Sequence, residues 1–197
     1  MQEAQKQFSK REKILEAALS VFTKEGFYNA KIEDIAQTAG VGKGTIYEYF
    51  KSKQELFQEM VKSDITSFIA DVGDSVEKRS NPKEKLLTIA LLHREFFLRS
   101  GDITQLLASC HQHLDKSFLS WTWEIQFEKL VQFQRIIEEG QKEGVFRKNL
   151  DPVLSAKLIN GGILSLFAPA MHGHREQLPG EAEIGALFEI LYEGMKG

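Results

Sequence analysis

The stretch from Ile32 to Phe50, IEDIAQTAGVGKGTIYEYF, limits most strongly what this chain can fold into. Its apolar residues recur at helical spacing on both sides of Gly40, which indicates two short helices joined by a tight turn. Glycine suits the reversal because it adopts a positive φ without the steric cost of a Cβ. We predict helices at residues 32–39 and from Gly42 or Lys43 to about residue 50. A plain helical corner in a core remains the alternative on periodicity alone.

The second of these helices has the side chains to enter a DNA major groove, as the second helix of a helix-turn-helix does. Lys43 stands at its N-terminus, where the free N–H groups and the ammonium both favour a phosphate. Gly44 permits close approach of the backbone, and Thr45 suits a base edge. Tyr47 can reach a phosphate with its hydroxyl. The residues expected to contact DNA are Lys31, Gly42, Lys43, Gly44, Thr45, Tyr47, Glu48, Tyr49 and Lys53.

The segment GFYNAKIEDIAQTAGVGKGTIYEYFKSKQELFQEM, which ends at Met60, resembles the DNA-binding signature of the TetR/AcrR family of bacterial transcriptional regulators. The resemblance covers residues 11–60, and the rest of the chain is similar to the family only in length and helical layout. It implies an all-α chain of about nine helices. A three-helix helix-turn-helix DNA-binding domain is expected at residues 1–51, and a helical ligand-binding and dimerisation domain at residues 52–197.

Three positions depart from the usual pattern of that family. Lys31 replaces a threonine that commonly caps the first of the two helices, and lysine is a poor N-cap. Gly42 replaces a serine, so a side-chain hydroxyl contact is lost. Glu48 puts a carboxylate on the helix expected to face DNA. These departures bear on the preferred DNA sequence and not on the family.

The composition is that of a soluble globular protein, with 42% hydrophobic and 27% charged residues among 197. No apolar run is expected to approach the roughly 20 residues that cross a bilayer, and the polar N-terminus is unlike a signal peptide. A single cysteine, Cys110, allows no internal disulfide, which favours the cytoplasm. Residues 1–60 carry nine basic and nine acidic side chains. DNA affinity of this neutral part should depend steeply on salt.

Helical periodicity continues along the rest of the chain, without strand alternation. A frayed arm is expected at residues 1–10, followed by a helix at residues 10–25 that ends at Gly26. Ser52 and Glu55 have the spacing of a capping box. The helix that they begin is expected to run to about residue 72 and to link the two domains. Further helices are expected at residues 82–99, 103–111, 117–143, 152–171 and 181–195.

The last two helices have the character of a dimer interface. Apolar residues of the final helix form one stripe. Two adjacent glycines in the preceding helix cost about 1 kcal/mol each relative to alanine, which suggests close approach of another backbone. A dimer also presents two DNA-binding domains about 34–36 Å apart, which is the spacing of half-sites one DNA turn apart. Packing within one chain is the alternative. The predicted interface residues are Gly161, Gly162, Ser165, Ile184, Leu187, Phe188 and Leu191.

The middle helices are rich in aromatic residues, more than one small core requires, with histidines among them. The resemblance implies that these helices enclose a ligand pocket, and an aromatic lining suits an apolar or aromatic effector or an acyl chain. Aromatic residues at helical spacing are equally what an ordinary core contains. The predicted pocket residues are His93, Phe96, Phe97, Trp121, Phe127 and Phe167.

Cys110, His111 and His113 are residue types that bind zinc or copper. Positions i and i+2 do not share a helix face, and the local sequence has no fourth ligand, so we expect no metal site; the pair His172 and His174 is equally weak. The sequence has no nucleophile elbow, phosphate-binding glycine loop or HExxH motif. We therefore expect no cofactor and no enzyme activity, with a metal- or thiol-dependent enzyme as a third possibility.

These patterns together predict a homodimeric, ligand-responsive repressor. Its partners are a near-palindromic double-stranded DNA operator, a small apolar or aromatic effector and a second copy of the chain, with no membrane. Effector binding among the middle helices is expected to shift the helix that begins at Ser52 and to favour a dimer geometry that misfits the operator. Glu48 and the neutral charge of the DNA-binding part support an alternative, a dimeric protein-interaction scaffold that binds DNA weakly.

Overall fold

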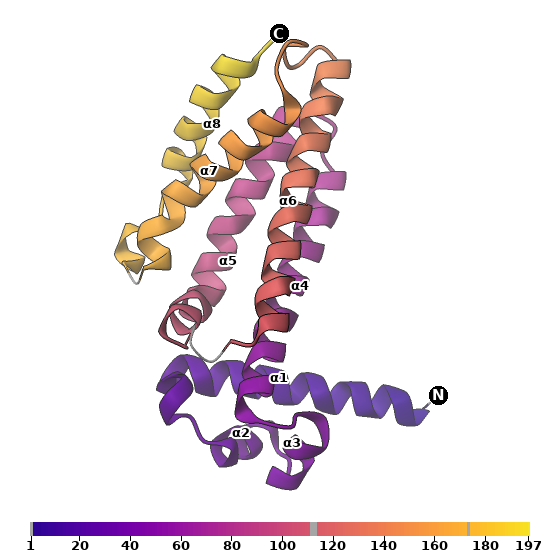
Figure 1. Ribbon diagram of the computed structural model, residues 1–197, viewed down its shortest axis with the longest axis vertical. Helices are drawn as coiled ribbons and strands as arrows, with labels where there is room; N and C mark the ends of the chain where they lie inside the picture. Colours follow the sequence, from indigo (N-terminus) through magenta and orange to yellow (C-terminus); the bar gives the residue numbers. More distant parts are fainter. Residues whose placement is uncertain (1, 111–113, 173) are drawn as a thin grey trace. The chain divides into compact units, whose positions relative to one another are not determined.

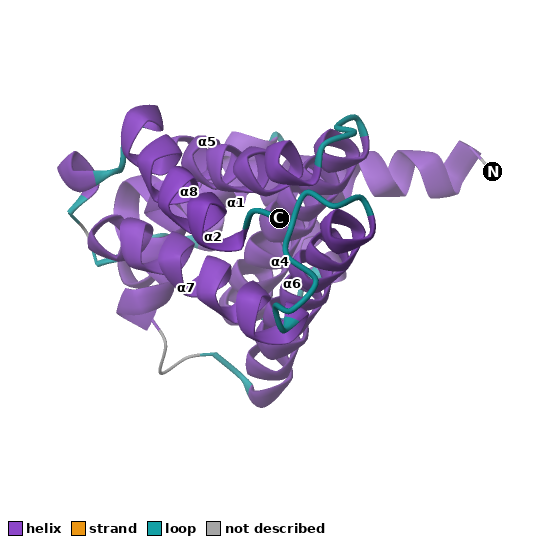
Figure 2. Ribbon diagram, turned by 90° about the horizontal axis from the view of Figure 1, so that it is seen from above, coloured by secondary structure: helices purple, strands orange, loops and turns teal. Residues whose placement is uncertain are grey.

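The computed structural model describes residues 2–110, 114–172 and 174–197, and within these ranges it contains helices and no strand (Figure 1, Figure 2). A single antiparallel bridge pairs Phe146 with Lys196. The predicted all-α class is confirmed. The elements are α1 Gln2–Asn29, α2 Ile32–Ala39, α3 Lys43–Tyr49, α4 Lys53–Glu77, α5 Pro82–Cys110, α6 Lys116–Lys142, α7 Pro152–Met171, the 3-10 turn η2 Arg175–Gln177 and α8 Glu181–Met195.

The chain divides into two compact units, which are described separately. Unit 1 comprises Met1–Ser67 and Asp102–Asp115, and unit 2 comprises Phe68–Gly101 and Lys116–Gly197. Both α4 and α5 contribute residues to each unit, because each helix continues past the point where the units divide.

Helix α5 is one element where two were predicted. Ser100 and Gly101 were expected to end it, but helical backbone continues through them to Cys110. The expected separate helix at residues 103–111 is therefore wrong, and about nine helices become eight α-helices in the described residues. A glycine inside a helix costs only about 1 kcal/mol relative to alanine. Burial of apolar residues on both sides, such as Phe97 and Ile103, outweighs that cost.

Helix α1 begins earlier than predicted, since residues 2–9, expected as a frayed arm, are helical. Gly26 does break the regular geometry, as expected, with φ 77° and ψ 162°. One further turn follows, closed by a hydrogen bond from Ala30 N to Gly26 O of 3.2 Å. The boundaries predicted for α2 and α3 are confirmed, and α4 extends one turn further than expected.

The core of unit 1 joins α1, α2 and α3 to the first turns of α4. Figure 1 shows α2 and α3 side by side beneath α1. The rings of Phe22 and Phe27 both contact Phe57 of α4, with centroids 5.3 and 5.1 Å away. This packing fixes the helix-turn-helix on its supporting helix. The other fully buried large side chains are Ile14, Ile35, Ile46, Phe50, Leu56 and Met60.

The core of unit 2 is formed by the second half of α4, by α5 to Gly101, and by α6, α7 and α8. Helix α7 supplies one continuous inward face at helical spacing: Ala156, Ile159, Ile163, Phe167 and Ala170 are all buried. The Phe167 ring stacks on Phe97 of α5 at 5.0 Å. Ile184 and Phe188 of α8 belong to the same core.

By length and composition alone, α7 is apolar enough to cross a membrane. The segment Pro152–Ala170 has a mean hydropathy of 1.4. The expectation that no apolar run approaches that length is therefore wrong. One such helix is weak evidence for a membrane span, because a core helix of a globular protein has the same composition. In unit 2 this helix has a buried inner face, with several apolar residues, including Leu154 and Leu158, exposed on the other side.

The end of α6 depends on a glycine. A Cβ built on Gly140 lies 2.1 Å from Cδ2 of the Phe146 ring, which is too close for any real contact. Phe146 is itself fixed, because it is 1% exposed, donates its N–H to Gly140 O at 3.0 Å and forms the bridge to Lys196.

Gly140→Ala is therefore expected to lower the free energy of unfolding by about 2 kcal/mol, since overpacking outweighs the better helix propensity of alanine. Urea denaturation followed by circular dichroism measures the change. Gly73→Ala in α4 is the control, because its Cβ meets nothing within 4 Å and the variant should be at least as stable as wild type. A Gly140→Ala protein as stable as Gly73→Ala would contradict the prediction.

Candidate nucleic-acid interface

The turn between α2 and α3 has the backbone geometry that its glycine predicts. Gly40 adopts φ 67° and ψ 34°, the left-handed region in which other residues are strained. Its N–H caps carbonyls at the end of α2, and Val41 N donates to Ala36 O at 3.0 Å. This is the paired C-cap arrangement that ends helices at a glycine. The turn therefore sets α3 against α2.

Helix α3 has one buried and one exposed side. Ile46 is 1% exposed and anchors the helix in the core, whereas Lys43, Gly44, Tyr47 and Glu48 are exposed. Thr45 and Tyr49 are half-buried at the edges, and the Tyr49 ring leans on Phe50 at 6.3 Å. The exposed side is the surface that enters a groove in a helix-turn-helix protein.

Lys43, the residue predicted to bind a phosphate, already has a partner. Its Nζ lies 2.5 Å from Oε1 of Glu33 on α2, and both side chains are exposed. The hydrogen bond between them lowers the pKa of Glu33 and raises the pKa of Lys43. A phosphate must therefore compete with the Glu33 carboxylate for this ammonium. No sequence pattern predicts the pair, because the two residues are ten positions apart on different helices.

Glu33→Gln is expected to raise DNA affinity about two- to fivefold, the size of effect of an exposed ion pair. Fluorescence anisotropy with a labelled fragment of the upstream region measures it. Asp34→Asn removes the same charge one residue away, where no ion pair to Lys43 forms, and should raise affinity less. Equal affinities of the two variants would show that only net charge matters.

Lys53 faces the protein. Its Nζ donates to Ala30 O at 2.7 Å and to Tyr28 O at 3.0 Å, and it lies 5.0 Å from the centroid of the Phe27 ring. Burial lowers its pKa. Two of the three ammonium hydrogens are thus used to cap the end of α1, a task that lysine performs well near helix C-termini. One hydrogen remains for the predicted contact with the DNA backbone.

The residues directly before α2 and α3 are two of those that differ from the usual pattern of the TetR/AcrR family. Lys31 and Gly42 occupy the N-cap positions of these helices, and neither makes a side-chain capping bond. Both residues are exposed. The N–H groups of the first turn of α3 are therefore not capped by a side chain of the protein, which leaves this end available to a phosphate.

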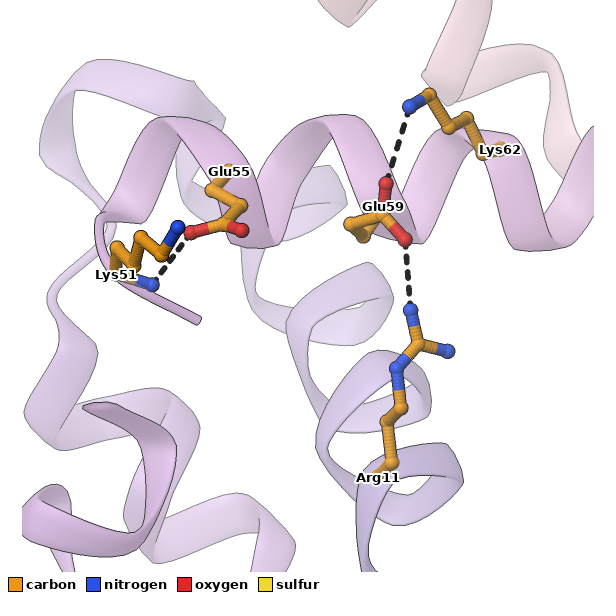
Figure 3. Close-up of polar contacts among 5 residues, drawn as sticks. All are labelled: Arg11, Lys51, Glu55, Glu59 and Lys62. Carbon is orange, nitrogen blue, oxygen red and sulfur yellow. Dashed lines mark hydrogen bonds and ion pairs between the residues drawn. The ribbon is translucent and has the colours of Figure 1, made fainter. Parts of the chain in front are cut away.

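Helix α4 is firmly attached to this unit at its beginning. Ser52 Oγ accepts from Glu55 N at 3.0 Å, as predicted, while the Glu55 carboxylate accepts from Lys51 N at 2.5 Å (Figure 3). One turn later the Glu59 carboxylate forms ion pairs with the Arg11 guanidinium of α1 at 2.7 Å and with the Lys62 ammonium at 3.1 Å (Figure 3). This carboxylate therefore joins α1 to α4.

Four of the six predicted pocket residues lie together in unit 2. His93, Phe96, Phe97 and Phe167 form a cluster with Phe68 of α4. Phe68 contacts His93 at 5.1 Å and Phe96 at 4.6 Å. We call these five residues the aromatic cluster. Trp121 lies elsewhere, against Phe118 at 5.6 Å, and Phe127 is 68% exposed on the outer side of α6.

Two basic groups of unit 2 have strongly lowered pKa values. Burial lowers the pKa of His93 to about 3, with the nearby charge of Lys129 as the second cause. Burial lowers the pKa of Lys129 on α6 to about 8. Perturbed groups of this kind are concentrated at functional sites. Lys129 was missed in the sequence, where an isolated lysine on an amphipathic helix looks like a solvent-exposed residue.

The predicted interface residues divide between core and surface. Ile184 and Phe188 are buried in the unit 2 core, and a Cβ built on Gly162 lies 3.4 Å from Cδ2 of Leu187, so these residues pack within one chain. Leu187 and Leu191 are half-buried. Gly161 and Ser165 are exposed. The same two helices also carry exposed large apolar residues that were not predicted for the interface: Leu154, Leu158, Leu164 and Ile190. We call the exposed residues of α7 and α8 the α7–α8 surface.

His111 and His113 lie outside the described residues, and nothing is described of the Cys110 side chain. His172 Nδ1 contacts Ala168 O at 2.8 Å, and His174 pairs with Glu176 at 3.4 Å. Within the part of the chain that the structure describes, no three His, Cys, Asp or Glu side chains gather as a metal site needs.

A short helix with a buried anchor and an exposed polar side, set on α2 by a glycine turn, defines a helix-turn-helix DNA-binding protein. Comparison with known proteins shows to which family of helix-turn-helix proteins the chain is similar. The sequence model described as "Bacterial regulatory proteins, tetR family" matches residues 14–60. The chain is 31% identical over 159 residues to the fatty acid metabolism regulator protein of Bacillus subtilis (strain 168), covering 76% of this chain and 77% of that one.

A second relative is the HTH-type transcriptional repressor NicS of Pseudomonas putida, 30% identical over 142 residues, covering 71% of this chain and 67% of that one. The crystal structure of the regulator FadR from Bacillus subtilis has a TM-score of 0.73 at 24% identity and covers 93% of this chain and 98% of its own. FadR from Bacillus halodurans has a TM-score of 0.72 at 21% identity, covering 94% and 99%. The chain therefore belongs to the TetR family and is a DNA-binding transcriptional regulator.

Proposed function

We propose that this regulator is a homodimeric repressor that leaves its operator when a small molecule with a long apolar part binds unit 2. The observation that carries the proposal is the exposed side of α3, held outward by the buried Ile46. Lys43, Gly44, Thr45 and Tyr47 then meet a near-palindromic DNA site, with Lys31, Gly42, Glu48, Tyr49 and Lys53 around them.

The proposed effector class rests on relatives and on composition. One relative is named a fatty acid metabolism regulator, and the FadR structure of Bacillus subtilis is a complex with stearoyl-CoA. In this chain the aromatic cluster offers an apolar surface from three helices, and Phe68, His93 and Phe96 remain half-exposed within unit 2. Such a surface suits an acyl chain.

The proposed dimer uses the α7–α8 surface. Exposed apolar patches of this kind in globular proteins mark interaction sites. Ile190 is 72% exposed, and Leu154 and Leu158 repeat on α7 beside Gly161. Gly161 has no atom within 4 Å of a built Cβ, so it leaves room for a partner backbone. A self-complementary surface of two helices gives two-fold symmetry.

The proposed signal passes along α4, which has residues in both units. We assign DNA binding to residues 1–51 and effector binding and dimerisation to residues 52–197. An effector changes the operator affinity only if it binds the two dimer geometries unequally. We also infer that the protein has no catalytic role and works in the cytoplasm, as expected of a transcriptional regulator.

Electrophoretic mobility shift with the gene's own upstream region tests the DNA-binding role. Wild type should retard the DNA fragment at low salt, and its affinity for the fragment should fall steeply as the salt concentration rises. Lys43→Ala with Tyr47→Ala should abolish the shift, while Lys78→Ala, at an exposed lysine directly after α4, should leave it unchanged. Absence of any shift by wild type, or equal shifts by all three proteins, would refute this role.

Light scattering after size-exclusion chromatography tests the dimer. Wild type should have twice the chain mass of 22.4 kDa. Leu158→Glu should be monomeric, because an unpaired carboxylate cannot enter an apolar interface without a large desolvation cost. Leu119→Glu, an exposed leucine of α6 away from the α7–α8 surface, is the control and should remain dimeric. A monomeric wild type would rule the dimer out.

A further inference from the structure

Helix α3 anchors one side chain in the core of unit 1, and this anchor fixes which of its residues face away from the protein. The anchor is Ile46, which is 1% exposed. Successive residues of an α-helix are about 100° apart around its axis, so the positions two before and two after Ile46 lie about 200° away, almost directly opposite. These positions are Gly44 and Glu48, and both are exposed. We call these two residues the outermost line of α3.

Lys43 and Tyr47 lie nearer to the core side of the same helix. By the same geometry they are about 60° and about 100° away from Ile46. The position of Lys43 agrees with its ion pair to Glu33 of α2, in which Nζ and Oε1 are 2.5 Å apart. Both side chains therefore flank the outermost line, which suits contacts with phosphates at the edge of a groove. The base edges in the middle of the groove are left to the outermost line.

The Glu48 carboxylate is available for a contact with DNA. It makes no hydrogen bond or ion pair with any residue that the structure describes. Gly44, one turn earlier, has no side chain, and a Cβ built there meets nothing within 4 Å. The backbone of α3 can therefore approach the base edges closely at this point, which brings the Glu48 side chain within reach of them.

A carboxylate in the major groove accepts hydrogen bonds and donates none. The donors on the base edges there are the N4 amino group of cytosine and the N6 amino group of adenine. Guanine presents two acceptors and thymine one, and adenine has its N7 acceptor beside the amino group, so each of these bases repels a carboxylate oxygen. Cytosine is the base whose own major-groove edge offers a donor without an acceptor beside it.

We propose that Glu48 selects one base pair in each half-site of the operator, by accepting a hydrogen bond from N4 of a cytosine. The inference rests on the proposed docking of α3 in the major groove. The negative charge of Glu48 repels phosphates and the acceptors of the other bases, so it lowers the affinity for DNA in general and spares sequences with cytosine at this position. Glu48 therefore contributes specificity, whereas Lys43 favours a phosphate of any sequence.

Selection of bound fragments from a random DNA library by the full-length protein tests the proposal. Wild type should select two half-sites that each contain an invariant cytosine. Glu48→Gln should select adenine at that position and leave the other positions unchanged, because an amide both donates and accepts and can pair with N6 and N7 of adenine. Glu12→Gln makes the same change of charge at an exposed residue of α1 and should select the wild-type sequence.

Fluorescence anisotropy with the selected duplex tests the contact at a single atom. In a second duplex, 2-pyrimidinone replaces the invariant cytosine, which removes the N4 amino group. The affinity of wild type for this duplex should be about tenfold lower. Glu48→Ala has no carboxylate to satisfy, so its affinity should fall by about twofold or less.

A selected half-site without an invariant cytosine overturns the proposal, as does the same selected base in Glu48→Gln and wild type. Equal losses of affinity in wild type and Glu48→Ala when the amino group is removed also overturn it. Thermal melting shows that each variant is folded. A wild type that selects no sequence rejects operator binding together with this inference. Sequence-specific binding that does not change with Glu48 rejects this inference alone and leaves the repressor proposal intact.

Discussion

Lowering the pH from 7 to 4 is expected to reduce the free energy of unfolding by about 3 kcal/mol through His93 alone. Burial, together with the charge of Lys129, holds the pKa of this imidazole at about 3 in the folded protein, against an ordinary value of 6.5. Between these two values the unfolded chain binds a proton that the folded chain does not. Stability from this residue is therefore complete above pH 6.5 and is lost as the pH falls toward 3.

Urea denaturation from pH 7 to pH 4, at one protein concentration, measures the effect. His93→Gln keeps a neutral polar side chain that does not titrate, so its stability should fall by about 3 kcal/mol less than that of wild type over this range. His172→Gln changes an exposed histidine and should reproduce the wild-type profile. Parallel profiles for wild type and His93→Gln would show that His93 is accessible to protons in the folded state.

Lys129→Met is expected to raise the free energy of unfolding by about 3 kcal/mol at pH 7. Burial lowers the pKa of Lys129 to about 8 from 10.5. In the unfolded chain the ammonium keeps its proton up to pH 10.5, so between pH 8 and 10.5 the unfolded state binds more protons and wild-type stability rises with pH. Below pH 8 the full penalty of the buried charge remains. Methionine has a similar length and no charge, so it removes that penalty.

The gain from Lys129→Met should therefore shrink as the pH rises from 7 and almost vanish at pH 10.5. Denaturation of wild type and variant across this range measures the difference. Lys142→Met, at an exposed site on the same helix, should show little gain at any pH. A Lys129→Met protein less stable than wild type at pH 7 would mean that the ammonium has a stabilising partner in the folded chain.

These two predictions concern residues that stability alone does not explain. His93 lowers the stability of unit 2 at acidic pH, and Lys129 lowers it at neutral pH. Strain of this kind is found where a site must be ready for a ligand.

The helix-turn-helix could be predicted from the sequence almost residue by residue. Gly40 requires a left-handed backbone, and the apolar spacing around Ile35 and Ile46 leaves only one way to bury both helices. The Ser52 cap and the Asp151 cap of α7 were equally readable, because capping depends on side chains within three positions. Local rules of this kind fix element boundaries.

Features that depend on separate elements could not be predicted. The Glu33–Lys43 pair requires the angle between α2 and α3, and the lowered pKa of Lys129 requires knowing its burial in the folded chain. The aromatic residues show the same limit: Phe97 and Phe127 look alike in sequence, yet one is in the core and the other is exposed. Continuity of α5 through Ser100 and Gly101 was missed because tertiary burial overrode a local breaker.

The bonds from Lys53 to the carbonyls of Tyr28 and Ala30 have a consequence for how the reading head moves. They tie the first residue of α4 to the short connection that enters α2 at Ile32. We therefore expect a rotation at the start of α4 to move the connection before α2, and with it the helices α2 and α3. The exposed Tyr47 of α3 is then expected to move together with the first turn of α4.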